Sequence, residues 1–599
     1  MRPLALTFFF LLSGCSPAAD DGPGETGPVG VRFDGCEEPA IAVAGGGCLR
    51  VGVEACGEGM VEDGRGGCTA NIASGCATNE LALAGDSACK PIDDCGSGPF
   101  AEVTGDEPTR YVDAAATGGD GTRTQPFSTI AQAIAGLPSG GRVLLAAGTY
   151  AESIELRAPF SLIGRCSRLV SIAPTSGTAS VTVRKPSTLA GLSITGPGMG
   201  VDANTDLVLR RVSIHDTGST GARMELTRTG RASIDSVVVQ AATGRGLHIG
   251  GGQVEVTRLA VRNTKAGSDG FGLGLVVLDG NDRVAGDLKI SRSFVSHSIG
   301  FAMLVQSTRA SVASTVLRDV SPAKNALANG NGIYLTPYPG EKASAELTLV
   351  GSLVEGARRS GIELRTGTLS MSSSVVRDID TGTDEKDGYG VYVAPTAHAT
   401  IDASVLEKAA KGGVYLQGES TLSRTVVRDT WSKPWRGAGQ GVIVYPQSSS
   451  TEPVAVSLDR VLVARAMTAG VFVVGGRVDL HASTVRGTVA NADGSFGDGA
   501  VAEPWISPAK VIPGSLRISD SWIGENARAG AVVWQGALAI TRSSLSCNAF
   551  DLETGGQLDP AHPELTSIVS DEGDTYCGCA STALCHARSS GLEPVRAGG

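Results

Sequence analysis

Short segments that alternate apolar and polar residues recur along most of this 599-residue chain. In residues 369–395, one such segment runs to a bend at Ser372-Ser373, a second ends at Val376, and a third, GVYVAP, begins at Gly390. Alternation with a period of two leaves one face of each β-strand apolar, and that face needs a partner. The pattern predicts short strands that are stabilised by the next copy of the same unit.

The unit repeats over more than half of the chain. Fourteen copies of the second segment lie between residues 189 and 545, and the glycine-initiated third segment recurs between them every 27.5 residues on average. Three short strands in such a repeat leave no room for a helix, and stacked strands pair edge to edge roughly 4.8 Å apart. We expect an all-β fold, a parallel β-helix of about fifteen three-strand turns.

Longer loops follow the second segment on every second turn. Each ends in Gly-x-Gly, and the loops are 262–271, 318–331, 377–389, 428–440 and 486–498. We expect the glycines to supply the positive φ that returns the chain to a strand. The alternation reflects either tandem duplication of a two-turn block of 56 residues or a row of functional loops on one edge, about 10 Å apart.

The first fifteen residues have the pattern of an export signal. An apolar run from Leu4 to Leu12 is too short to span a bilayer, and it ends in Leu-Ser-Gly-Cys, which resembles the lipobox of bacterial lipoproteins. The resemblance implies cleavage before a lipidated Cys15, with Ser16 favouring the outer membrane, whereas the alternative is an ordinary secretory peptide. Residues 16–35, rich in Pro, Gly and Asp, are predicted to be a flexible tether.

The remaining twelve cysteines indicate a disulfide-rich, exported protein. Residues 36–98 form a predicted small module of three repeats, too short to build a core without cross-links. Its seven cysteines are Cys36, Cys48, Cys56, Cys68, Cys76, Cys89 and Cys95. Because seven is odd, we predict that Cys166 completes the set and ties the module to the β-helix.

A second even group of cysteines lies in the C-terminal segment, residues 547–599. It comprises Cys547, Cys577, Cys579 and Cys585. A CxC pair near His586 is compatible with a metal site, but the spacing lacks the paired CxxC of zinc folds, so disulfides are the favoured interpretation. The sequence does not give their pairing.

Residues 111–165 resemble the N-terminal entry of pectin-lyase-like right-handed parallel β-helix proteins. The resemblance is carried by the stretch Pro126-Phe-Ser-Thr-Ile130 and by Gly148-Thr-Tyr150. It implies a helix through about Leu137, with Ser128 as N-cap, which covers the open end of the stack. With the repeats, it implies a right-handed β-helix over residues 99–546, closed at the far end by residues 547–599. This fold hosts lyases, hydrolases, epimerases and adhesins.

No catalytic residues are assigned from the sequence. Asn204-Thr-Asp206 and Gly244–Gly250 faintly resemble two polygalacturonase motifs, but the paired aspartates expected between them are absent, so the hydrolysis cannot be assembled. The loop around Asp378, Asp380, Asp384 and Asp387 has enough carboxylates for Ca²⁺, although it lacks EF-hand spacing and solvated acids are the favoured interpretation.

A row of residue pairs, each an arginine followed by Asp or in one case by Asn, comes after the second segment of four turns. The pairs are Arg262-Asn263, Arg318-Asp319, Arg377-Asp378 and Arg428-Asp429. Stacked on successive blocks, they are expected to form a solvated ladder that contributes little to stability. The alternative is a row that binds acidic sugars.

Aromatic residues supply the candidate binding surface. In the third segment, the residue between the two apolar positions is expected to point outward; these residues are His248, Gly274, Ala302, Tyr334, Glu363, Tyr392, Tyr415, Ile443 and Phe472. Rings in line either stack on sugars or form an aromatic ladder within the fold. The candidate binding residues are Tyr334, Tyr392, Tyr415 and Phe472, with Trp431 and Trp435 in one long loop.

A net charge of −11 and a pI near 5.3 make nucleic acid and anionic lipid surfaces poor partners. The sequence favours a lipid-anchored scaffold of the bacterial outer membrane or cell surface that binds polysaccharide or a surface partner, with no cofactor beyond the weak Ca²⁺ candidate. The alternatives are a lyase or hydrolase of acidic polysaccharide and a purely structural envelope protein. Adjacent outward carboxylates with Arg or Lys in a cleft favour the enzyme, and an aromatic stripe without them favours binding.

Overall fold

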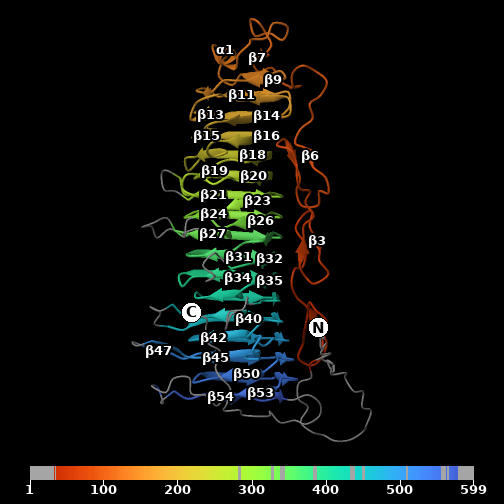
Figure 1. Ribbon diagram of the computed structural model, residues 1–599, viewed down its shortest axis with the longest axis vertical. Coiled ribbons are helices and arrows are strands. Elements are labelled where there is room, and N and C mark those ends of the chain that lie inside the picture. Colours follow the sequence, from red (N-terminus) through yellow and green to blue (C-terminus); the bar gives the residue numbers. More distant parts are fainter. Residues whose placement is uncertain are drawn as a thin grey trace, which may run out of the picture.

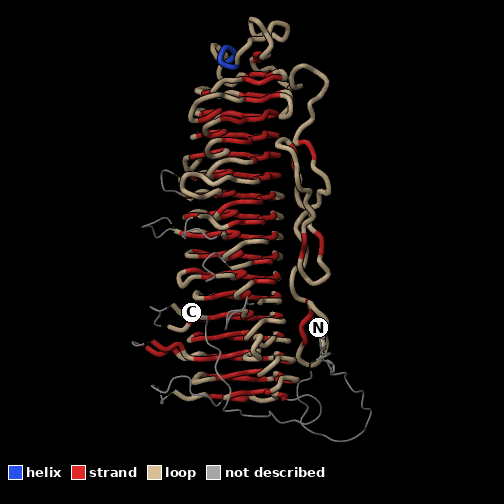
Figure 2. Tube along the Cα trace, in the orientation of Figure 1, coloured by secondary structure: helices blue, strands red, loops and turns tan. Residues whose placement is uncertain are grey.

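The alternating segments form coils of a parallel β-helix (Figures 1 and 2). This computed structural model describes residue 33 and residues 35–577 apart from nine short segments, 281–284, 325–329, 338–343, 382–386, 432–438, 448–451, 508–509, 555–561 and 563–564. Each coil contributes three short strands, which pair in parallel with the same strands of the coils before and after it. The predicted fold class is confirmed.

The first and second strands of the coils lie in one 31-stranded sheet and the third strands in a 16-stranded sheet. Sixteen third strands agree with the expected number of turns. The first strands are β7 (Thr109–Val112), β8 (Arg142–Leu145), β11 (Ser161–Gly164), β22 (Asp287–Ser291), β25 (Arg309–Ala313), β28 (Glu346–Val350), β31 (Gly367–Ser372), β34 (Ala397–Asp402), β37 (Ser420–Ser423), β40 (Val454–Asp459), β43 (Gly476–His481), β48 (Ser515–Ser519), β51 (Ala537–Thr541) and β54 (Ile568–Asp571).

In four early coils the first and second strands are continuous, as β14 (Ser187–Gly196), β16 (Leu207–Thr217), β18 (Arg231–Gln240) and β20 (Gln253–Arg262). The separate second strands are β9 (Gly148–Tyr150), β12 (Val170–Ile172), β23 (Phe294–Ile299), β26 (Val316–Ser321), β29 (Leu353–Glu355), β32 (Val375–Ile379), β35 (Val405–Ala409), β38 (Val426–Arg428), β41 (Leu462–Ala464), β44 (Thr484–Arg486), β49 (Trp522–Gly524), β52 (Ser544–Ser546) and β55 (Tyr576–Cys577).

The third strands correspond to the glycine-initiated third segment of the repeat. They are β10 (Ile154–Leu156), β13 (Ala179–Val183), β15 (Met199–Ala203), β17 (Ala222–Glu225), β19 (Arg245–Gly250), β21 (Leu273–Leu278), β24 (Phe301–Gln306), β27 (Asn331–Thr336), β30 (Ser360–Leu364), β33 (Tyr389–Val393), β36 (Gly412–Leu416), β39 (Gln440–Val444), β42 (Ala469–Val474), β45 (Asp498–Glu503), β50 (Ala529–Val533) and β53 (Phe550–Glu553). A hairpin of β46 (Trp505–Ser507) and β47 (Lys510–Ile512) follows β45.

The core is one continuous column of apolar side chains inside the coils. Val354, Val376, Leu406 and Val427 pair in register on four successive second strands, and all four are fully buried. From Ile172 to Leu545 the coils supply Val, Ile or Leu at this position, because the side chains of a strand alternate between the two faces of the sheet. The interior column that the repeat predicted is therefore present.

The two glycines of the Gly-x-Gly pattern have different roles. Gly439, the first glycine of one copy, has φ of +100°, which confirms the expected turn back into a strand at this position. Gly441, the second, faces the interior, where an added Cβ would lie 2.5 Å from both the Gly470 carbonyl oxygen and the Val463 Cγ1. Only glycine fits there, because the next coil already fills the space.

One short helix, α1 (Ile130–Ile134), lies beside β7 and β8 at the N-terminal end of the stack (Figure 1). It is shorter than predicted, and its N-cap is Thr129 rather than Ser128. Thr129 and Gln132 form a capping box, whose two reciprocal hydrogen bonds fix the first turn. Gly136, with φ of +75°, and the following proline end the helix before Leu137.

The cysteine-rich module consists of three small antiparallel hairpins. They pair β1 (Ala40–Ala42) with β2 (Cys48–Arg50), β3 (Val61–Glu62) with β4 (Cys68–Thr69), and β5 (Glu80–Leu81) with β6 (Lys90–Pro91). Each hairpin is closed by one disulfide, Cys36–Cys48, Cys56–Cys68 or Cys76–Cys89. The fourth bond, Cys95–Cys166, joins the module to the β-helix, as predicted.

Cys547 and Cys577 near the C-terminal end are also disulfide-bonded, whereas Cys579 and Cys585 lie outside the described residues. Disulfides persist in oxidising compartments, so this cysteine use is that of an exported protein. In the described part of the chain, no helix is long and apolar enough to cross a membrane.

The module lies along the outer side of the second strands (Figure 1). There, one apolar side chain of each coil points outward and packs against the module. This outer apolar column consists of Val238, Ala260, Phe294, Val316, Leu353, Val375, Val405, Val426 and Leu462, all buried. Ile41, Val51, Met60 and Leu81 of the module cover it. The second-strand face is therefore closed, and the first-strand and third-strand faces remain.

Candidate functional site

The outward column of the third-strand sheet differs from the predicted one at two coils. Val276 and Leu304 stand in register between His248 and Tyr334, in the places expected for Gly274 and Ala302. An added Cβ at Gly274 would lie 2.5 Å from the Ala302 carbonyl oxygen, and Ala302 is fully buried in the core. Gly274 and Ala302 thus belong to the inner small-residue column, because the pattern in these coils starts two residues later than the repeat suggested.

The aromatic residues of this column stack on one another. The rings of Tyr392 and Tyr415 have centroids 5.4 Å apart and lie within 7° of parallel, and those of Phe301 and Tyr334 are 4.8 Å apart and within 5°. Ring faces that are occupied by neighbouring rings are not available to a sugar, so the tyrosines offer edges and hydroxyl groups. This geometry is that of the aromatic ladder, which was the alternative prediction.

Three further aromatic candidates were predicted, and the structure describes two of them. Phe472 is only 1% exposed and packs in a cluster with Trp505 of the β46–β47 hairpin, so it is not part of an exposed stripe. Trp431 is half-buried, and its amide donates to the Ala409 carbonyl oxygen at 3.2 Å. Trp435 lies outside the described residues.

A buried glutamate interrupts the aromatic column between Tyr334 and Tyr392. Glu363 is 2% exposed and is held by Arg365 at 2.6 Å and by the Asn331 amide at 2.7 Å. Burial raises the pKa of Glu363, although the neighbouring arginines act in the opposite direction. The carboxylate is committed to these partners, which makes it a structural element of the column.

The predicted acidic loop residues do not converge. Asp378 lies 3.6 Å from Lys408, Asp380 lies 3.4 Å from Arg358, and Asp387 lies 3.0 Å from Arg359. Asp384 is outside the described residues. Among the residues that the structure describes, no group of three or more His, Cys, Asp or Glu side chains is placed to hold a metal ion. Ca²⁺ binding by this loop stays a prediction.

The arginine row is not a solvated ladder, and this prediction was wrong. Arg428 is fully buried, 2.7 Å from Glu407 and hydrogen-bonded to the Arg65 carbonyl oxygen of the module. Arg262, 8% exposed, donates to the Glu80 carbonyl oxygen at 2.9 Å. The module covers these two arginines, which bind its backbone instead of solvent or an acidic sugar. Arg377 donates to Thr69 Oγ1 of the module at 3.2 Å, whereas Arg318 pairs with Asp319 at 3.3 Å.

A polar cluster occupies the N-terminal end of the third-strand sheet. His248 Nε2 lies 2.9 Å from Glu225 Oε1, and the His248 side chain is 7% exposed. Beside this pair, Asp202 accepts from Arg223 at 2.8 Å and from Arg184 at 3.2 Å. The acids are paired and the imidazole is buried, so the histidine of the motif-like segment 244–250 stands in a closed network.

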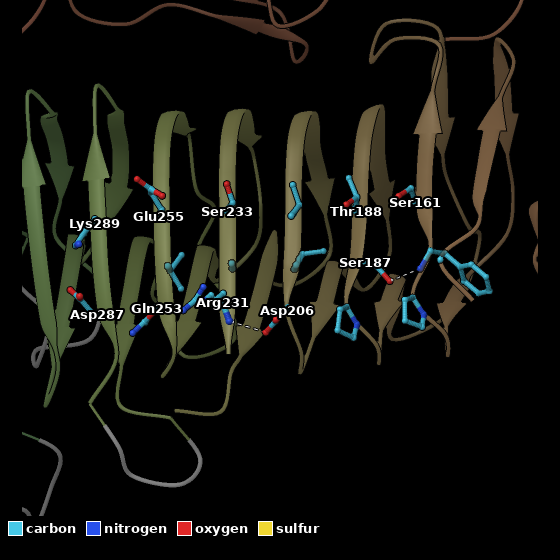
Figure 3. Close-up of a pocket in the computed structure, with 18 residues that line it drawn as sticks. Ser161, Ser187, Thr188, Asp206, Arg231, Ser233, Gln253, Glu255, Asp287 and Lys289 are labelled. Atoms are coloured by element: carbon cyan, nitrogen blue, oxygen red, sulfur yellow. Dashed lines mark hydrogen bonds between the residues drawn. The ribbon is translucent and has the colours of Figure 1, made fainter. Parts of the chain in front are cut away.

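An open cavity lies on the first-strand face. It is a groove of about 740 Å³ that spans the coils from Ser161 to Lys289 (Figure 3). One row of outward residues runs in register across six coils and consists of Ser161, Thr188, Val208, Ser233, Glu255 and Lys289. A second row, Asp206, Arg231, Gln253 and Asp287, lies beside it. At roughly 4.8 Å per coil the groove is about 24 Å long.

The charged side chains in this groove are not neutralised by one another. Glu255 and Lys289 are neighbours in register and both exposed, yet neither they nor Arg231 form an ion pair anywhere in the described part of the chain. Elsewhere on the same sheet, Arg258 is bound by Asp235 at 2.6 Å. Unpaired acid and base side chains that share a cavity with hydroxyl and amide groups are available to a ligand.

The sequence did not identify this groove. Of its polar residues only Asp206 was singled out, as part of a motif-like segment, and its Oδ1 accepts from the Arg231 amide at 2.8 Å. The groove could have been found from the residues at outward-facing positions of the first strands. In the coils of the groove, charged residues occupy positions where later coils have Ser or Thr, such as Thr348, Ser370 and Thr400.

Residues 115–170 match the family described as "Protein of unknown function (DUF1565)". No curated protein matches the chain. The fold defines a parallel β-helix repeat protein.

Several solved structures are similar at low identity. The pectate lyase Pel9A is 13% identical, with 59% of this chain and 76% of that chain covered and a TM-score of 0.29. The pectin methylesterase PemA from Erwinia chrysanthemi is 14% identical, with coverage of 54% and 80% and a TM-score of 0.22. The Dettilon tailspike protein is 9% identical, with coverage of 65% and 62% and a TM-score of 0.27.

Proposed function

We propose that this protein is a lipid-anchored envelope protein that binds an extended polysaccharide in the groove of its first-strand face and so acts as a binding and adhesion scaffold. The Leu-Ser-Gly-Cys15 sequence supports the anchor, which places the protein at the bacterial outer membrane or cell surface. The disulfides support export.

The observation that carries the proposal is the groove itself. It is open along its length and combines hydroxyl, amide and unpaired charged side chains in two rows at one-coil spacing. A polysaccharide presents hydroxyl groups that both donate and accept, repeated along an extended chain, so regularly spaced donors and acceptors suit it. Arg231 and Lys289 add charge-assisted hydrogen bonds, which are stronger than neutral ones.

Glycan binding by matched variants tests this proposal. The full chain with Cys15→Ser, purified without the anchor, is applied to a glycan array, and the affinity for the best ligand is then measured by calorimetry. Arg231→Gln should weaken binding about tenfold or more, because a hydrogen bond to a charged group contributes about 1.5–3 kcal/mol. Arg477→Gln is the control, since Arg477 is exposed in the same row but lies far outside the groove.

Equal affinities of Arg231→Gln and the unmodified chain would remove the groove as the binding site. If the chain binds no glycan on the array, polysaccharide is excluded as the ligand. A surface protein is then the remaining partner for a scaffold.

A second function is favoured by one specific observation. Glu255, Asp287 and Lys289 bring two carboxylates and an ammonium group into one groove, which is the arrangement that a lyase or hydrolase of an acidic glycan requires. Incubation with uronic polymers distinguishes the two functions: release of unsaturated or shortened oligosaccharides, abolished in Lys289→Gln, would establish the enzyme. Binding without products supports the scaffold.

A further inference from the structure

The cysteine-rich module runs along the β-helix in the direction opposite to the progress of the coils. Its last residues lie at the N-terminal coils, where Cys95 is bonded to Cys166 and the Asp93 carboxylate accepts from the Ser167 amide at 2.7 Å. Its first residues lie at the C-terminal coils, where the Ala42 amide donates to Thr484 Oγ1 at 3.2 Å. Figure 1 shows the module beside the stack along this path.

Contacts between these two ends keep this direction from one hairpin to the next. Starting from the N-terminal coils, Ser213 donates to the Thr78 carbonyl oxygen at 2.6 Å and Arg262 to that of Glu80 at 2.9 Å. Farther along, Arg377 donates to Thr69 Oγ1 at 3.2 Å, Arg65 pairs with Asp429 at 2.7 Å, and Glu38 pairs with Arg465. The third hairpin thus contacts the earliest of these coils, the second hairpin the middle coils and the first hairpin the last ones, so the order of the hairpins runs opposite to that of the coils.

These contacts fix the module firmly. The outer apolar column beneath it is buried along nine coils, from Val238 to Leu462. The fully buried Arg428 donates to the module backbone, so separation of the two parts would leave a buried guanidinium without this partner. The direction of the module is therefore a fixed property of the fold.

We propose that the chain leaves the molecule at the C-terminal end of the β-helix, so that an anchor at Cys15 holds the C-terminal coils near the membrane and presents the N-terminal coils away from it. This inference rests on the proposed anchor. The order of the sequence alone suggests the reverse, since the N-terminal coils come first after the module. Because the module runs antiparallel to the order of the coils, the C-terminal coils and not the N-terminal coils lie next to the anchored end of the chain.

The dimensions give the height at which the groove is presented. Nine strand-to-strand steps separate the coil of Thr484 from that of Arg231, or roughly 43 Å at about 4.8 Å per step. The groove is thus directed at a polymer several tens of ångströms from the lipid headgroups, and its partner is the polysaccharide layer rather than the membrane surface.

Energy transfer to a membrane dye tests the orientation. A fluorescent amino acid is placed in the full-length lipidated protein either at Arg123, beside the N-terminal cap, or at Ser570, on the last first strand; both residues are exposed. The protein is reconstituted into vesicles that carry an acceptor lipid. Quenching at Ser570 is expected to exceed quenching at Arg123 several-fold, because the two sites lie at opposite ends of the stack.

Equal quenching or stronger quenching at Arg123 would overturn the proposed orientation. The Cys15→Ser chain provides the anchor control: it should not sediment with vesicles, and sedimentation of neither chain would overturn the anchor and the orientation together. Arg231→Gln should retain the quenching difference even where it loses glycan binding, which separates a failure of the groove from a failure of the orientation.

Discussion

At the scale of single residues, a ladder of buried hydroxyl groups secures the corner between the first and second strands. Ser352 donates its amide to Ser374 Oγ at 3.1 Å, and Ser374 donates its amide to Ser404 Oγ at 3.2 Å. The Ser374 hydroxyl in turn donates to the Ser372 carbonyl oxygen at 2.8 Å. The corner residue Ser373 has φ of +46°, so its neighbours cannot continue the regular ladder and the hydroxyl groups replace it.

Removal of one hydroxyl should therefore be costly. Ser374→Ala leaves the buried Ser352 amide without its acceptor, which is expected to cost about 1–3 kcal/mol of unfolding free energy. Amide hydrogen exchange at Ser352 measures the loss of this hydrogen bond, and the urea midpoint measures the loss of stability. Ser374→Thr is the control, because Thr315 and Thr425 occupy the same ladder in other coils. Unchanged exchange at Ser352 in the alanine variant would contradict the role of the ladder.

At the scale of elements, the β46–β47 hairpin packs beside an unusual acid. Glu503, at the end of β45, is 5% exposed, and its Oε2 has no hydrogen-bond partner within the described residues. Burial alone raises the pKa of Glu503 to about 8. The carboxyl group is therefore neutral in the folded protein at pH 7, whereas in the unfolded chain it is ionised.

This difference makes stability depend on pH in a defined window. Between about pH 4.5 and about pH 8 the folded state keeps the Glu503 proton and the unfolded state releases it, so the free energy of unfolding should fall by at most a few kcal/mol as pH rises through this range. Above this range Glu503 is ionised in both states and adds no further pH dependence. Thermal unfolding of the protein and of Glu503→Gln across pH 5–9 checks this pH dependence of stability. The difference between the two curves should grow with pH; a constant difference would exclude the ionisation of Glu503.

At the scale of the whole molecule, the module and the β-helix are one folding unit. The outer apolar column would otherwise be an exposed stripe along most of the stack, of the kind that monomeric proteins avoid. The module cannot build a core of its own, and it uses this column as its second half. Each part therefore supplies the surface that the other requires.

A charge placed under the module should release it locally. Leu353→Asp introduces a carboxylate into the fully buried column, which is expected to cost about 3 kcal/mol or more, because an unpaired buried charge is strongly unfavourable. Val350→Asp is the matched control three residues earlier, where the side chain is 42% exposed on the open first-strand face. Hydrogen exchange in residues 56–62 should accelerate only in Leu353→Asp. Similar exchange in both variants would show that the column does not hold the module.

The sequence by itself determined the coil, its apolar interior and the closing of the module by disulfides. These depend on local alternation, on glycine at turns and on cysteine parity, which repeat in every copy and need no knowledge of distant contacts. The odd number of cysteines in the module also indicated that Cys166 pairs with one of them, whereas its partner, Cys95, is given by the tertiary structure.

Only the tertiary structure decided which face of the coil is open. Arg262 and Arg428 resemble solvent-exposed residues in the sequence, yet the module covers them, because the direction in which it packs is set by contacts between residues hundreds of positions apart. The same packing leaves the first-strand face free and brings Arg231, Glu255 and Lys289 from three coils into one groove. No local pattern encodes that arrangement, since each of the three residues is a single exposed charge in its own strand.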